Sequence, residues 1–196
     1  NQTSGNRGGA IFLDNNIDLT VVNCEFSNNS CNGGFGNGGG VLAIYKSSGN
    51  SNANFINCTF AYNNGGSDYG ALNNQDGGTV NVMNCIFFGN SDNGTNISSG
   101  NHNCTDLGGN IFSDPIFTNP TENDFTISVG SPAINSSVSS SGIFNTPTTD
   151  ISGNIRTSPA DVGCFEFGTQ VINLISDCSV FSSNCTAPGS PSGDNT

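Results

Sequence analysis

The chain has 196 residues, with 3 basic and 15 acidic side chains and a net charge of −12. So few Lys and Arg residues cannot replace the counterions at nucleic-acid phosphates or bind an anionic membrane surface, and we expect neither partner. No apolar run approaches the ~20 residues of a spanning helix, so membrane insertion is not expected. Roughly a sixth of the residues are Asn and the aliphatic residues are sparse, which favours a narrow core over a bulky helical one.

A short segment is repeated three times along the chain. Residues 22–29 read VNCEFSNN, residues 56–63 read INCTFAYN and residues 83–90 read MNCIFFGN. Within each copy, apolar positions alternate with polar ones, which is typical of a strand with one buried face. A unit that recurs roughly every thirty residues indicates a stack of repeats, because one unit cannot bury its apolar face alone.

Stacking would bring equivalent residues of successive repeats into columns about 4.8 Å apart. We expect a Cys column, a Phe column and a ladder of hydrogen-bonded Asn side chains, formed by Cys24, Cys58 and Cys85, by Phe26, Phe60 and Phe87, and by Asn29, Asn63 and Asn90. The predicted fold class is all-β, a short right-handed parallel β-helix with a C-terminal strand and linker tail. The alternative is an antiparallel sandwich, which gives no reason for Cys and Phe to repeat in register.

The pattern divides the chain into three parts. Repeat units occupy residues 1–107, terminal units and a cap occupy 108–167, and a strand, a loop between two Cys residues and a linker occupy 168–196. We expect the middle part to cap the stack, because an exposed edge strand invites aggregation and Pro115 and Pro132 lack the N–H that would extend a ladder.

The middle part carries an ordered series of short motifs. They are Asp114-Pro115-Ile116-Phe117, Asp124-Phe125, Gly130-Ser131-Pro132-Ala133-Ile134, Asp150 with Gly153 and Arg156, and Asp161-Val162-Gly163-Cys164-Phe165-Glu166. This order resembles the C-terminal end of bacterial surface β-helix proteins of the choice-of-anchor kind, and the upstream repeats resemble those of polymorphic outer-membrane proteins. The resemblance covers about residues 8–167 and departs from the family at Cys164. It implies a right-handed parallel β-helix at a cell surface.

The two ends of the chain predict an assembly. The first recognisable unit begins near Gly8, so its outer face needs an upstream domain, the first few residues or another copy to cover it. Near the other end, an apolar segment is suited to pair with its own body or with the sheet edge of a second copy; its candidate assembly residues are Val171, Ile172, Leu174 and Ile175. Contacts of this head-to-tail kind build filaments.

Eight Cys residues favour an oxidising setting, so we expect an extracellular or cell-surface protein. The disulfide candidates are Cys178 with Cys185, Cys24 with Cys31, and Cys85 with Cys104. Alternatively, the column thiols pack as small apolar groups, and spacing alone does not fix the connectivity.

Several Asn residues lie in acceptor sequences for N-linked glycans. They are Asn28, Asn57, Asn93, Asn96, Asn103, Asn135 and Asn184. We expect Asn57 to lie in the middle of a strand with its side chain pointing outward. Tyr45, Tyr62 and Tyr69 are candidates for stacking on sugars or for packing at corners.

No set of residues predicts catalysis. A glycosidase needs two facing carboxylates, and a lyase needs a base near calcium, but Arg7 and Lys46 have no acidic cluster beside them. His102 and Asp150 with Arg156 are expected to be surface groups of little energetic effect. No cofactor is expected; the alternative is calcium bound by loop carboxylates, namely Asp14, Asp18, Asp68, Asp76, Asp92 and Asp106. The predicted function is a non-catalytic extracellular structural or surface protein, in one form a fibre protomer, and the alternative is a carbohydrate-binding or polysaccharide-cleaving β-helix protein.

Overall fold

The computed structural model describes residues 2–3, 8–31, 38–45, 50–66, 70–74, 78–90 and 104–168. This part of the chain is all-β with one short 3₁₀ turn. The elements are β1 (Gln2–Thr3), β2 (Ile11–Asp14), β3 (Asp18–Val22), β4 (Glu25–Ser27), β5 (Ser30–Cys31), β6 (Leu42–Tyr45), β7 (Asn52–Ile56), β8 (Thr59–Ala61), β9 (Leu72–Asn74), β10 (Val80–Met83), β11 (Ile86–Phe88), β12 (Cys104–Asp106), β13 (Phe117–Asn119), η1 (Pro120–Glu122), β14 (Asp124–Ile127), β15 (Ser140–Ser141) and β16 (Phe144–Asn145).

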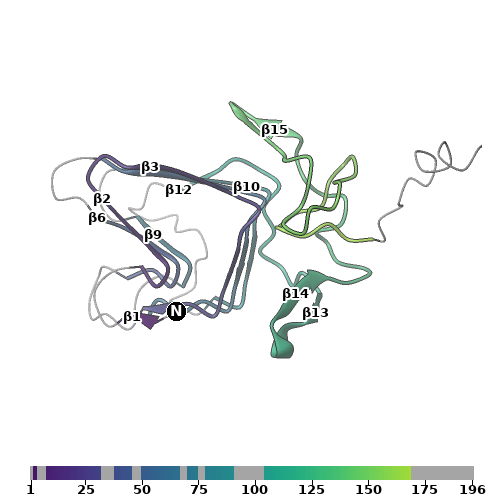
Figure 1. The fold of residues 1–196 in the computed structure, drawn as a ribbon, viewed down its shortest axis with the longest axis horizontal. Coiled ribbons are helices and arrows are strands. Elements are labelled where there is room, and N and C mark those ends of the chain that lie inside the picture. Colours follow the sequence, from purple (N-terminus) through teal and green to yellow (C-terminus); the bar gives the residue numbers. More distant parts are fainter. Residues whose placement is uncertain are drawn as a thin grey trace, which may run out of the picture.

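Equivalent strands of successive repeats pair in parallel and in register. They form three sheets, with the orders β2–β6–β9, β12–β10–β7–β3 and β11–β8–β4. In Figure 1 the strands of each sheet lie nearly over one another, so that the view runs down the stack. Parallel stacking of the repeats is therefore confirmed, and the antiparallel sandwich is wrong for these strands. Among the described strands, antiparallel pairing is confined to β13–β14 and β15–β16.

The Asn that precedes each repeated Cys forms a corner between two sheets. Asn23, Asn57 and Asn84 have φ angles of 51°, 49° and 54°, in the left-handed region that Asn tolerates better than most residues. The expected uninterrupted strand through the motif is therefore wrong, because the chain turns once at the Asn and then continues as β4, β8 or β11. We call these three residues the first corner.

All three predicted columns are present in the interior of the stack. The Phe26, Phe60 and Phe87 rings stack with centroid distances of 5.3 and 4.6 Å. Cys58 and Cys85 are buried beside Phe55 and Phe60 in one apolar cluster, with Cys24 packed against it. Because successive layers pair in register, an interior side chain of a middle layer lies between the residues at the same position in the layers above and below.

The Asn ladder is also confirmed. The backbone N–H and the side-chain amide of Asn29 both donate to Asn63 Oδ1, at 3.0 Å each. The same two groups of Asn63 donate to Asn90 Oδ1 at 2.9 and 2.8 Å. These amides satisfy backbone groups that a bend of the chain would otherwise leave without partners.

A fourth repeat unit follows the three recognised in the sequence. Strand β12 pairs with β10 in register, and Ile111 forms a parallel bridge with Ile86. The Phe112 ring stacks on Phe87 at 5.6 Å, so it extends the Phe column. The expected boundary at residue 107 falls inside this unit, and the signal for it was Asn110-Ile111-Phe112, which matches Cys85-Ile86-Phe87 with Asn in place of Cys.

Residues 113–168, which we call the side layer, lie beside the stack. Phe117, Phe125, Ile127, Ala133 and Val162 form a second apolar cluster with residues on the outer face of β8 and β11. Figure 1 shows β13, β14 and β15 next to the stacked sheets. The expectation that this segment caps the end of the stack is therefore wrong for the described residues, because its apolar side chains cover a sheet face.

Candidate functional site

Arg156 fastens the side layer to the first corner. Its Nη2 donates to Asn23 Oδ1 at 2.9 Å and to Gly163 O at 2.8 Å. Its Nη1 donates to Asp161 O at 3.1 Å and to Glu166 Oε2 at 3.2 Å, and its Nε donates to a backbone carbonyl. All the donor atoms of the guanidinium are used, so this arginine has a structural role in the described part of the chain.

The predicted exposed pair of Asp150 and Arg156 is wrong. The ion pair is formed with Glu166, and the two side chains are only 1% and 5% exposed. Asp150 instead accepts from the backbone N–H of Ser152, Asn154 and Glu166 and so shapes its own loop. Burial lowers the pKa of the Arg156 guanidinium, while the nearby carboxylates of Glu166 and Asp150 favour its charged form.

Asn57 is fully buried, so the prediction of an outward-facing glycosylation site is wrong. Its side-chain amide donates to Asp161 O at 3.1 Å and to Gly163 O at 3.4 Å, under the side layer. Asn28 and Asn135 are exposed and remain candidates. The other glycan candidates lie outside the described residues, and they are Asn93, Asn96, Asn103 and Asn184.

The two local disulfides predicted within the stack are not formed. Cys24, Cys85 and Cys104 carry thiols, and the Cys24 and Cys85 thiols each donate to the carbonyl two residues earlier. The Cys24 and Cys85 thiols belong to the interior Cys column, whereas Cys31 lies on β5, beyond the next bend of the chain. Several predicted residues lie outside the described part of the chain: Cys178, Cys185, Val171, Ile172, Leu174, Ile175, Arg7, Lys46, Asp68, Tyr69, Asp76, Asp92 and His102.

Buried thiols should make the fold sensitive to alkali. Burial raises the pKa of Cys104 and of Cys164 to about 12. Between the ordinary thiol pKa of 9.0 and about 12, the folded chain holds more protons than the unfolded chain, so stability falls as the pH rises. We expect the free energy of unfolding, measured with urea, to fall with rising pH from about pH 9 upward. The fall should be less steep in Cys164→Ala. Equal pH profiles for the variant and the parent protein would contradict this.

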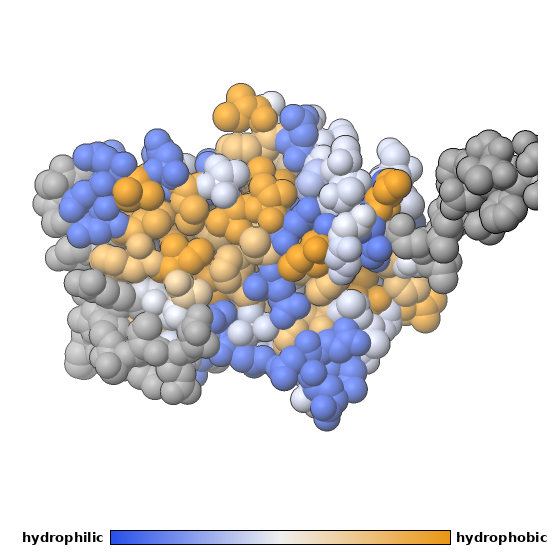
Figure 2. All heavy atoms as spheres, viewed as in Figure 1, coloured by the Kyte–Doolittle hydropathy of each residue, from blue (hydrophilic) through white to orange (hydrophobic). Residues whose placement is uncertain are grey.

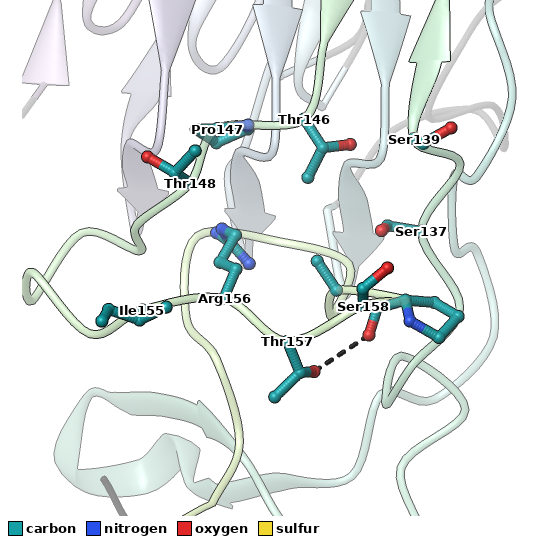
Figure 3. A pocket seen from close by; sticks show the side chains of 11 residues that line it. Ser137, Ser139, Thr146, Pro147, Thr148, Ile155, Arg156, Thr157 and Ser158 are labelled. Atoms are coloured by element: carbon teal, nitrogen blue, oxygen red, sulfur yellow. Dashed lines mark hydrogen bonds between the residues drawn. The ribbon is translucent and has the colours of Figure 1, made fainter. Parts of the chain in front are cut away.

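A hollow of about 510 Å³ opens in the side layer. Figure 3 shows it lined by the hydroxyl groups of residues such as Ser137, Thr146 and Thr148, together with Ile155 and two prolines. The guanidinium of Arg156 is held by the bonds described above, and Thr157 Oγ1 donates to Pro159 O at 2.9 Å. No carboxylate lines this hollow, so its lining residues offer hydrogen bonds and apolar contact but no acid–base pair.

A second hollow, of about 230 Å³, lies at the other bend of the repeats. Asn28, Tyr62 and Gly89 occupy equivalent positions there with φ angles of 52°, 54° and 66°, and we call them the second corner. Asn28, Tyr62, Pro120 and Thr121 line the hollow, so it lies between the stack and η1 of the side layer.

The first layer of the stack has an edge that is open along β3, whereas β5 of the same layer pairs with β1. The N–H of Asn52 donates to Ile17 O, and backbone groups in a parallel strand alternate between its two neighbours, so the odd-numbered residues of β3 face β7. The backbone groups of Asp18, Thr20 and Val22 therefore point away from the stack, and no described strand pairs with this edge, since β3 is the outer strand of its sheet.

The two ends of the stack differ in chemistry. Five apolar residues in the first layer are only partly buried, namely Ile11, Leu19, Val21, Cys24 and Phe26, and in the view down the stack Figure 2 shows apolar residues gathered over its centre. In the last unit, register places Asp106 in the column of Val21, Phe55 and Val82. Asp106 accepts from Gly108 N and Asn110 Nδ2, so a polar group replaces the core residue there.

No family model matches the chain, and no curated protein and no solved structure matches it. Among the described residues, no helix has the length and apolar character needed to cross a membrane. In the same residues, no group of three or more His, Cys, Asp or Glu side chains is arranged to hold a metal ion.

Proposed function

We propose that this chain is a non-catalytic structural module of an extracellular or cell-surface protein, related to the bacterial surface proteins that its motifs resemble. Its stacked parallel sheets would be the coils of a short right-handed β-helix. The open edge of β3 carries the proposal, because it combines an outer strand without a described partner with neighbouring apolar side chains that are only partly buried. Such an edge is a template for another chain.

The occupant of this edge is a second copy, added head to tail. The Phe column supports this choice, because its two end rings are both accessible: Phe26 is partly buried and Phe112 is 44% exposed. End-on contact would place Phe26 of one copy over Phe112 of the next and continue the ring stacking. Leu19 would meet Cys104 in the same way, since register aligns both with Ala53 and Val80.

Asp106 opposes this contact and would keep it weak. In the end-on arrangement the carboxylate faces Val21 of the next copy, and an inward-pointing charge at a sheet edge is a known device against uncontrolled strand addition. The expected association is therefore reversible and dependent on concentration.

The test is sedimentation velocity over a wide range of concentrations. Thr20→Pro removes an N–H that points outward from β3 and leaves the bonds to β7 intact, so we expect it to abolish association while thermal unfolding stays close to that of the parent. Thr20→Ala keeps the N–H and is the matched control. Asp106→Asn keeps the hydrogen-bond acceptor but removes the charge, and should strengthen association.

The proposal is wrong if the parent protein sediments as a monomer at every concentration. It is also wrong if Thr20→Pro associates as Thr20→Ala does, because contact would then not use this edge. The partly exposed Cys24 thiol gives a second measurement, since its reaction with a maleimide should slow as the protein concentration rises.

A further inference from the structure

The ring of Tyr62 forms an exposed platform at the second corner. It is 38% exposed on the side of the 230 Å³ hollow. Below, it packs against Phe88, with centroids 6.0 Å apart at 83°, and against Phe125, at 5.9 Å. Two apolar neighbours therefore hold the ring, while more than a third of the residue stays exposed.

The backbone at Tyr62 has a strained conformation. A φ of 54° is unusual for a bulky residue, and such strained backbone persists only where the surrounding structure maintains it. Gly89 is the equivalent residue in the next unit, and a Cβ there would lie 2.6 Å from the Tyr62 ring carbons. Because Gly89 has no side chain, there is room for the Tyr62 ring. The corner itself does not need an aromatic residue, since Asn28 occupies the equivalent position in the preceding unit.

Asn28 lines the same hollow as the platform, and its side-chain amide is bonded to that of Asn123. Asn28 Nδ2 donates to Asn123 Oδ1 at 2.8 Å. This bond orients both amides and leaves Asn28 Oδ1 as an acceptor and Asn123 Nδ2 as a donor with no partner among the described residues. An acceptor and a donor next to an aromatic face match the paired hydroxyls and the C–H face of a sugar ring.

The lining residues also restrict the ligand. Asn28, Tyr62, Pro120 and Thr121 carry no charge, and the chain has a net charge of −12, which repels acidic polysaccharides. No acid or base lines the hollow, so it is suited to binding and not to cleavage. We propose that this hollow is a binding site for one neutral hexose unit of a polysaccharide, with Tyr62 stacking on the ring and Asn28, oriented by Asn123, bonding its hydroxyl groups.

The site is tested by isothermal titration calorimetry with protein that carries no N-linked glycans, so that the Asn28 amide stays unmodified. The probes are cellohexaose, maltohexaose and mannohexaose, with an oligogalacturonate as the acidic comparison. We expect at least one neutral probe to bind in the millimolar range or tighter, and the acidic one to bind more weakly.

Matched variants identify the residues that bind. Tyr62→Asn removes the ring but keeps a residue suited to the left-handed corner, and it should weaken binding about tenfold or more. Tyr62→Phe keeps the ring and should bind like the parent, whereas Asn28→Ala should weaken binding several-fold through the lost hydrogen bond. Ser158→Ala, in the other hollow, is the control for nonspecific effects.

Failure of all three neutral probes to bind overturns the proposal, and so does unchanged binding by Tyr62→Asn. Equal losses in Ser158→Ala would also overturn it, because binding would then not be specific to this hollow. These outcomes do not depend on the association of copies, since Thr20→Pro protein can be titrated in the same way.

Discussion

Replacing Arg156 with Leu should lower the free energy of unfolding by about 3–5 kcal/mol, the range for removing one partner of a buried ion pair. The substitution leaves the Glu166 carboxylate buried without its cation. It also leaves Asn23 Oδ1 without this donor and removes the shorter of two hydrogen bonds to the carbonyl of Gly163, which keeps the bond from Asn57. The measurement is equilibrium urea unfolding, with limited proteolysis to show whether residues 113–168 detach before the stack unfolds.

Two further variants separate charge from geometry at this position. Arg156→Lys keeps the positive charge but has a single nitrogen, so it should recover only part of the loss. Ile155→Ala changes the neighbouring side chain, which is 72% exposed, and should have little effect. A loss of less than about 1 kcal/mol in Arg156→Leu would mean that the side layer does not depend on this residue.

Truncating Phe60 to Ala should cost about 3–5 kcal/mol, because the cavity would interrupt the Phe column in its middle. This fully buried ring stacks between Phe26 and Phe87 and also meets the edge of Phe55 at 5.2 Å. Loss of the ring therefore removes contacts in both directions along the stack as well as across it. Urea unfolding monitored by far-ultraviolet circular dichroism is the measurement.

The same column supplies its own control. Among the described residues Phe112 stacks on Phe87 alone, and it is 44% exposed, so Phe112→Ala should cost much less than Phe60→Ala. Similar losses for the two variants would show that stability does not follow burial along the column, and that the stack does not unfold as one unit.

The columns could be predicted from the sequence because stacking in register is a local rule. Once Cys58 aligns with Cys85, the fixed spacing within each copy also aligns Phe60 with Phe87 and Asn63 with Asn90. The corner at Asn57 was missed because a straight strand and a strand that bends once at a left-handed residue have the same alternation of apolar and polar residues in the sequence. The repeated Asn before each Cys was the available signal.

The side layer could not be placed from the sequence, because its position depends on contacts between distant segments. Arg156 meets Asn23 across more than a hundred residues, and nothing in the local pattern near either residue indicates the partner. The motifs of the side layer form turns and place carboxylates in buried positions. Their sequence pattern would be the same if the segment covered an end of the stack instead of a side. For the same reason the hollow beside Tyr62 was not foreseen, since η1 completes it from the side layer.

The first corner also ties three successive units to the side layer in a fixed order. Each of its three Asn residues has its own partners in the side layer: Asn23 bonds Thr149 O, Asn57 bonds Asp161 O and Asn84 bonds Val138 O. An ordinary repeat protein can gain or lose a unit and still fold, because each unit contacts only its neighbours. Here the deletion or duplication of one of these three units would put an amide opposite the wrong carbonyl, so the side layer sets the register of the units that it covers.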